Sequence, residues 1–195
     1  SILNVLRSGM FENYWFASGT PTFLAEMLKK THYDLRELDG LEVTAASLTD
    51  DRADVNNPVP MIYQSGYLTI KGYDTELRLY KLGYPNDEVK YGFLNFITPF
   101  YTSLDESKAP FYIGQFVKEL RAGDVEAFLT RLRAFFADFP YELNDKTERH
   151  YQVVFYLVFK LLGQFINAEV QSALGRADAV VKTANAVYVL SLIHI

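Results

Sequence analysis

The 195-residue chain contains no cysteine, which excludes both a disulfide framework and a zinc site built on thiolates. The three histidines, His32, His150 and His194, lie far apart and lack the spacing of metal ligands. An absence of cysteine also fits a reducing compartment, so we expect a cytoplasmic protein.

Long apolar runs and an excess of positive charge are missing as well. The most apolar run within a predicted helix, VVFYLVF, ends at Lys160, well short of the roughly 18 residues that span a bilayer. We therefore expect no transmembrane segment and no membrane partner. The formal net charge of −5 argues against the broad basic surface of many nucleic-acid-binding domains, but it leaves room for a local basic groove.

The chain also lacks the phosphate-binding motif G-x-x-x-x-G-K-[ST], so its own residues offer no ATP site. It begins with Ser1 rather than Met, and it stops at Ile195 within an apolar strand. On these grounds we expect a fragment of a longer protein.

What is present is a core-forming composition, with 49% hydrophobic and 15% aromatic residues. Two β-hairpins are predicted, at 67–82 and near 178–193, from alternating apolar residues around turn signals. The fold class that follows is α+β, mainly helical with two β-hairpins. Apolar spacing and capping residues predict helices at 21–30, 86–100, 111–123, 124–139 and 145–167. Asn86 is expected to cap the second of these helices, Gly123 to end the third, and Asp124 to open the fourth, so that the third and fourth form a helical hairpin.

The last hairpin carries a lone carboxylate, Asp178, whose partner is predicted by strand register. A turn centred on Ala184 and Asn185 sets Val181 opposite Tyr188 and Asp178 opposite Ser191. A Mg²⁺ site for phosphodiester hydrolysis needs carboxylate oxygens and gains from a nearby lysine. A Glu at position 191 and a Lys at 193 would complete such a site, but the sequence has Ser191 and Ile193.

Several blocks in order resemble one bacterial family, the predicted AAA-ATPase-like proteins fused to a PD-(D/E)XK nuclease-superfamily domain. The resemblance covers almost the whole chain. The blocks are FENYWF-x-SGTPTFL at 11–24, QSGYLTIK at 64–71, LGYPNDEV at 82–89 and E-x-x-Y-Q…FKLLG…E…GRADAVV…AVYV at 148–189.

This resemblance implies a three-part layout. Residues 1–35 resemble the C-terminal tail of the ATPase-like domain, whose ATP site would lie upstream of this chain. Residues 36–105 resemble a connecting module, a turn-rich linker over 39–60 followed by a winged-helix-like segment. Residues 106–195 resemble a truncated nuclease domain, the first half of a restriction-endonuclease-like αβ core.

The resemblance also implies roles for three acids. Asp178 matches the metal-binding Asp and would hold Mg²⁺, while Glu148 on the long helix and Glu169 at its end match acids that would assist catalysis. The implied partner is nucleic acid, with DNA favoured. Each acid also has a structural interpretation: Asp178 as a turn cap or partner of Arg176, Glu148 as a helix-start residue, and Glu169 as a solvated residue.

In the family the final strand continues as Glu-Phe-Lys, whereas here positions 191–193 read Ser-Leu-Ile. We interpret SLIHI as a frame change or junction read-through, and we expect little or no nuclease activity from this chain. The alternative function is a non-catalytic interaction module, in which the helical segment 106–167 packs against a protein partner. The apolar final strand would then be an open edge that invites pairing.

Overall fold

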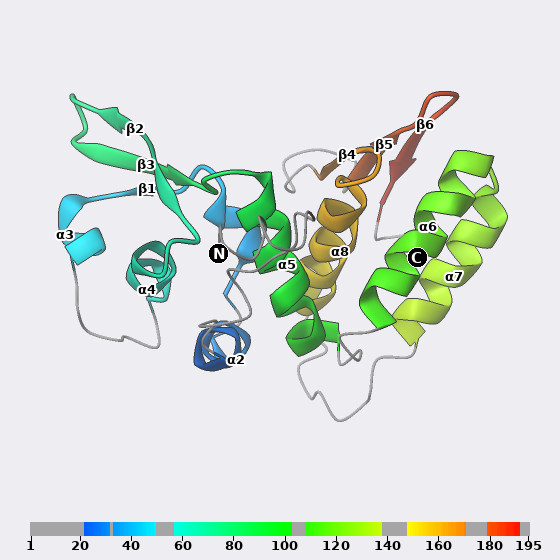
Figure 1. Ribbon diagram of the computed structural model, residues 1–195, viewed down its shortest axis with the longest axis horizontal. Coiled ribbons are helices and arrows are strands. Elements are labelled where there is room, and N and C mark those ends of the chain that lie inside the picture. Colours follow the sequence, from blue (N-terminus) through cyan, green and yellow to red (C-terminus); the bar gives the residue numbers. More distant parts are fainter. Residues whose placement is uncertain are drawn as a thin grey trace, which may run out of the picture. The chain divides into compact units, whose positions relative to one another are not determined.

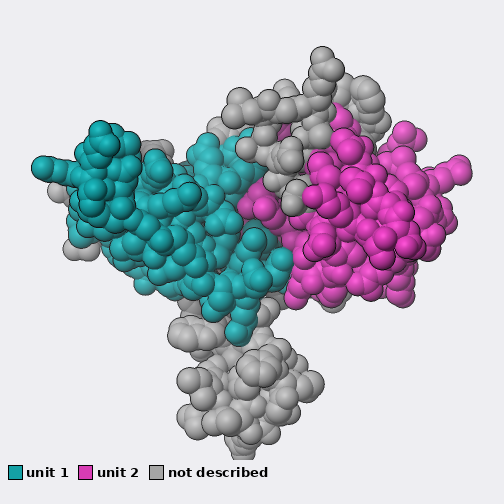
Figure 2. All heavy atoms as spheres, turned by 90° about the horizontal axis from the view of Figure 1, so that it is seen from above, with its two compact units in different colours: residues 1–96 teal, residues 97–195 magenta. Residues whose placement is uncertain are grey.

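The computed structural model describes residues 22–31, 33–49, 57–102, 108–137, 148–170 and 179–191. The chain divides into two compact units, residues 1–96 and 97–195, coloured separately in Figure 2. In the described parts of both, helices predominate and strands form two small sheets, which confirms the mixed, mainly helical class.

The first unit contains a three-stranded antiparallel sheet in the order β1-β3-β2 (Figure 1). Its hairpin was predicted, but the third strand lies in the passage that reads as a linker, which also contains a short helix. The elements of this unit are α2 (Thr22–Lys30), a 3₁₀ helix (Leu35–Leu38), β1 (Glu42–Val43), α3 (Ala45–Thr49), α4 (Val59–Gln64), β2 (Thr69–Asp74), β3 (Leu79–Gly83) and the first part of α5 (Asp87–Thr102).

Local signals explain where these elements begin and turn. The Asn86 side chain accepts a hydrogen bond from the Val89 amide at 2.9 Å, which caps α5 as the sequence predicts. At the β2–β3 turn, Asp74 Oδ1 accepts hydrogen bonds from the amides of Glu76 and Leu77. Arg78 in that turn has a φ of 55°, a left-handed backbone conformation that is uncommon for residues other than glycine.

The second unit combines helices with a three-stranded antiparallel sheet in the order β4-β5-β6. Gly123, with a φ of 75°, ends one helix, and the Asp124 carboxylate caps the next by accepting from the Ala127 amide at 3.0 Å. Both signals confirm the predicted helical hairpin. The elements are the end of α5, α6 (Lys108–Ala122), α7 (Val125–Ala137), α8 (Glu148–Leu162), β4 (Asn167–Val170), β5 (Ala179–Lys182) and β6 (Val187–Leu190).

Aromatic rings join α6, α7 and α8 into one core. Phe116 contacts Phe128 edge-on with ring centroids 5.5 Å apart, and Phe128 contacts Phe159 in the same manner at 6.4 Å. Nearly every residue of α8 from 153 to 162 is buried, which confirms that this helix is covered on most faces. No helix in the described ranges is long and apolar enough to cross a membrane.

The end of α8 differs from the prediction. The helix stops at Leu162 rather than near 167, and a turn follows in which the Gly163 amide bonds to the Phe159 carbonyl and the Phe165 amide to the Leu162 carbonyl. Residues 167–170 then form β4, so the terminal hairpin is the outer part of a three-stranded sheet. The predicted opening of the helix at Asp145 lies outside the described residues.

Candidate functional site

The register of the last hairpin agrees with the sequence prediction. Val181 pairs with Tyr188, and the ladder continues to Ala179 opposite Leu190. At the turn, the Thr183 amide donates to the Ala186 carbonyl at 2.8 Å, and Thr183 Oγ1 accepts from the Ala186 amide at 3.1 Å. The hydroxyl and backbone of Thr183 therefore hold the turn that sets the register.

Asp178 immediately precedes β5 and lies outside the described residues. Ser191 follows β6 directly and is partly buried. The described ladder stops one pair short of these two positions, so the pairing of Asp178 with Ser191 stays a prediction. Ile193 also lies outside the described residues.

The two faces of this sheet differ in exposure. Ala179 and Val181 are fully buried on one face, while Val187 and Val189 on the other are 62% and 65% exposed. Because side chains alternate along a strand, Val180 and Lys182 lie on the more exposed face of β5.

Glu169 does not lie at a helix end, as the sequence suggested, but in β4, where it pairs with Val180. This correction follows from the pairing of β4 with β5, a contact that helical periodicity does not reveal. The structure thus places Glu169 on the strand beside the one that follows Asp178. Glu148 is the first residue of α8, and the side chains of Glu148 and Glu169 are outside the description.

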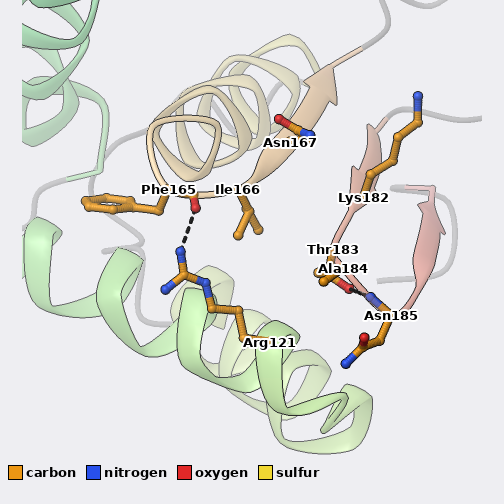
Figure 3. A pocket seen from close by; sticks show the side chains of 8 residues that line it. All are labelled: Arg121, Phe165, Ile166, Asn167, Lys182, Thr183, Ala184 and Asn185. Carbon is orange, nitrogen blue, oxygen red and sulfur yellow. Dashed lines mark hydrogen bonds between the residues drawn. The ribbon is translucent and has the colours of Figure 1, made fainter.

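Described residues contain no group of three or more histidine, aspartate or glutamate side chains that would hold a metal. A pocket of about 560 Å³ opens at the turn end of the second sheet (Figure 3). Its lining comes from the end of α6, the α8–β4 connection and the β5–β6 turn. The lining residues are Arg121, Phe165, Ile166, Asn167, Lys182, Thr183, Ala184 and Asn185.

Arg121 is one of the pocket residues that the sequence did not single out. Its Nη2 donates a hydrogen bond to the Phe165 carbonyl oxygen at 2.7 Å, across 44 positions of sequence. A basic residue in the last turn of a helix is common because it opposes the negative end of the helix dipole. That pattern was visible in the sequence, but nothing in it indicated a partner beyond α8.

Comparisons with known proteins bear on the second unit most directly. No solved structure matches the chain. A protein of Azotobacter chroococcum mcd 1, described as an uncharacterized protein in the vnfD 5′ region, is 30% identical over 205 residues. The match covers 96% of this chain but 37% of that relative, so the chain spans little more than a third of the relative's length. Residues 146–192, which include α8, β4, β5 and β6, match the PD-(D/E)XK nuclease superfamily.

Proposed function

We propose that residues 106–195 are the first part of a metal-dependent nuclease domain, in a longer protein that also has an AAA-ATPase-like domain. The observation that carries this proposal is that the superfamily match covers α8 and the three paired strands of one sheet, β4, β5 and β6. The ATPase-like tail at 1–35 and the connecting module at 36–105 rest on the resemblance of sequence blocks. Nucleic acid, with DNA favoured, is the proposed substrate.

The donor set argues that this chain holds only part of a metal site. Mg²⁺ prefers several oxygen ligands, usually including one or two carboxylates. Asp178 offers one carboxylate, while Ser191 offers a neutral hydroxyl and Ile193 no ligand. The strand pair therefore does not fit Mg²⁺ by itself, and we derive no hydrolytic step through a metal.

Glu169 is the acid whose backbone position best supports an assisting role. It pairs with Val180, and Asp178 lies two residues before Val180, which makes positions 169 and 178 diagonal neighbours if the strands continue. Diagonal neighbours in an antiparallel pair lie roughly 7–8 Å apart, within reach of one shared ligand. We assign Glu148 an assisting role on the resemblance alone.

The decisive experiment restores the missing residues. The chain as it stands should not cleave plasmid or oligonucleotide DNA in Mg²⁺ or Mn²⁺, whereas the double variant Ser191→Glu with Ile193→Lys should gain metal-dependent cleavage. Adding Asp178→Asn to the restored variant should abolish that gain. Robust cleavage by the unaltered chain that depends on Asp178 would contradict the proposal that the chain holds half of a metal site. A folded restored variant that neither cleaves DNA nor binds Mn²⁺ would contradict the nuclease assignment.

Exposed apolar side chains on α6 and α7 favour a second candidate function, a helical interaction module without chemistry. Phe111 is 61% exposed and Val125 is 39% exposed. Exposed large apolar residues are a feature of protein-binding surfaces. The parent reading frame separates the two functions: a phosphate-binding loop before Ser1 and a Glu-x-Lys after Leu190 favour the nuclease, and their absence favours the module.

A further inference from the structure

One side of α6 carries cations and an exposed aromatic ring but no acid. Its side chains recur at intervals of three or four residues, so they lie on the same side of the helix. The cations are exposed, the phenylalanine is 61% exposed and the glutamine is partly exposed. The five residues, which we call the α6 stripe, are Lys108, Phe111, Gln115, Lys118 and Arg121.

The opposite side of α6 builds the core. Ile113, Phe116 and Leu120 are buried, and Phe116 contacts Phe128 of α7 edge-on. Figure 1 shows α7 beside α6 on this packed side. The α6 stripe is therefore the side of the helix that faces solvent. Such a side commonly alternates charges of both signs, whereas the charges of the stripe have one sign.

The acids of the α6–α7 hairpin are engaged away from the stripe. Glu119, the one acid among residues 108–122, accepts a hydrogen bond from Arg131 Nε of α7 and is 11% exposed. The Asp124 carboxylate caps α7. In the described part of the chain, neither Lys108 nor Lys118 forms a salt bridge.

This hairpin also differs in charge from the chain as a whole. Residues 108–137 contain five lysines and arginines against three acids, which gives a net charge of +2. The complete chain has a net charge of −5. Positive charge is therefore concentrated in a segment whose own core contacts do not require it.

Arg121 keeps its charge although it bonds to a neighbouring segment. Its Nη2 donates to the Phe165 carbonyl oxygen at 2.7 Å, an acceptor that carries no net charge. That bond engages one of the five N–H donors of the guanidinium group. Lys118 lies three residues earlier, so the two like charges are neighbours on the helix surface, an arrangement that slightly destabilises a helix. A bound anion would remove this repulsion.

The order of residues along the stripe fits a single strand of nucleic acid. From Lys108 to Arg121 the stripe extends about 20 Å, at 1.5 Å per residue, with Phe111 between the cations. Proteins that bind single strands combine cations for the phosphates with aromatic rings on which bases stack. A compact anion would contact Lys118 and Arg121 but would leave the ring and Lys108 unused.

We infer that the α6 stripe binds a single strand of nucleic acid, with its cations on the phosphates and Phe111 stacked on a base. This inference rests on the proposed function for its substrate class, but it needs neither cleavage nor a metal. It places a nucleic-acid contact on a helix that precedes the matched superfamily region, residues 146–192.

Metal-free binding of a fluorescent single-stranded DNA oligonucleotide tests the phosphate contacts, by anisotropy in EDTA over a series of salt concentrations. Each phosphate contact on a single strand contributes about 0.7 to the slope of log affinity against log salt. Lys108→Gln and Lys118→Gln should each weaken binding and make the slope shallower by about that amount. Arg133→Gln removes an exposed charge of α7 outside the stripe and should leave the slope unchanged.

A matched pair of variants tests stacking. Phe111→Ala should weaken binding at least about fivefold with an unchanged slope, because it removes a base contact and no phosphate contact. Phe23→Ala removes a ring that is 54% exposed in the first unit and should leave the affinity unchanged. In a Trp15→Phe background, Phe111→Trp makes the stripe residue the single tryptophan of the chain, and its fluorescence should be quenched as the oligonucleotide binds.

Two results would overturn the inference in variants whose circular dichroism is unchanged. One is a slope for Lys108→Gln and Lys118→Gln equal to that of Arg133→Gln. The other is an affinity of Phe111→Ala equal to that of Phe23→Ala.

Competition separates nucleic acid from an acidic protein segment. Unlabelled oligonucleotide should displace the probe at a much lower concentration of negative charge than polyglutamate does. Equal displacement by the two competitors would mean that the stripe docks acidic protein segments and that the inference is wrong.

The outcomes also distinguish this inference from the proposed nuclease chemistry. Asp178→Asn should not alter metal-free binding. If the restored variant neither cleaves DNA nor binds Mn²⁺ while the stripe variants weaken binding, the stripe stands and the nuclease assignment fails. If the restored variant cleaves and the stripe variants bind like the unaltered chain, the nuclease assignment stands and the stripe fails.

Discussion

Tyr188 in β6 donates a hydrogen bond from its hydroxyl to the Leu120 carbonyl oxygen in α6, over a distance of 3.3 Å. The two residues are 68 positions apart in sequence. Tyr188 pairs with the fully buried Val181 across the sheet, and its hydroxyl also lies close to Gly123 at the end of α6. One side chain thus connects the terminal hairpin to the helical core.

Removing that hydroxyl should weaken the second unit. We expect Tyr188→Phe to lower the free energy of unfolding by about 1 kcal/mol, because a neutral intramolecular hydrogen bond contributes about that much. Urea denaturation followed by circular dichroism measures the change. Tyr112→Phe removes a hydroxyl from a half-buried α6 tyrosine that contributes ring contacts, and an equal loss there would show that the Leu120 bond is unimportant.

The Glu119–Arg131 pair between α6 and α7 should respond asymmetrically to substitution. The Glu119 side chain is 11% exposed and its Oε2 is buried without a hydrogen-bond partner, whereas Arg131 is 36% exposed. Arg131→Met leaves a nearly buried carboxylate unpaired, so it should cost about 1–3 kcal/mol, more than Glu119→Gln. Urea denaturation measures the loss of unfolding free energy in each variant. Equal losses for Arg131→Met and Glu119→Gln would mean that water still solvates the Glu119 carboxylate.

Tyr33 in the first unit should make stability depend on alkaline pH. Burial, together with the negative charges of Glu37 and Asp34, raises the pKa of Tyr33 to about 12, from an ordinary value of 10.0. Since the folded-state pKa is the higher one, the stabilising contribution is complete below pH 10 and is lost as the pH rises toward 12.

This dependence can be measured by denaturation of the wild-type chain and Tyr33→Phe at a series of pH values. The wild type should lose more stability than the variant between pH 10 and pH 12. Near-ultraviolet absorbance should show one fewer late-ionising tyrosine in the variant. Parallel stability curves for the two proteins would contradict the raised pKa.

The exposed face of β6 should promote self-association. Val187 and Val189 are 62% and 65% exposed, on a strand that, among the described residues, pairs on one side with β5. Unpaired edge strands with apolar side chains are templates for further pairing. Val187→Thr with Val189→Thr should keep β propensity and reduce concentration-dependent association, measured by sedimentation velocity. Unchanged association in a folded variant would place the contact elsewhere.

Features set by neighbours in sequence could be predicted without the structure. Asn86 and Asp124 cap the helices that they were expected to cap, because a side chain two or three residues before an amide is always within its reach. The β5–β6 register follows similarly from a short turn, since few residues separate the pairs. The predicted pairing of Asp178 with Ser191 extends that local rule and stays a prediction.

Features set by distant neighbours could not be predicted. β1 has two residues and β4 has four, and each is a strand because another strand pairs with it, not because of its own alternation. For this reason Glu169, which we expected at the end of a helix, lies in a sheet. The pocket depends on the same effect, since Arg121 meets Phe165 only after α6 packs beside the end of α8.

The sequence by itself determined the capping of α5 and α7, the end of α6 at Gly123 and the turn-set register of the last hairpin. It also predicts, without a test from the described residues, that Asp178 lies opposite Ser191. Only the tertiary structure decided that a third strand carries Glu169 and that Arg121 and Lys182 flank one pocket. The physical reason is range: caps and tight turns act over two to five residues, whereas strand pairing and helix packing join segments through burial of apolar surface.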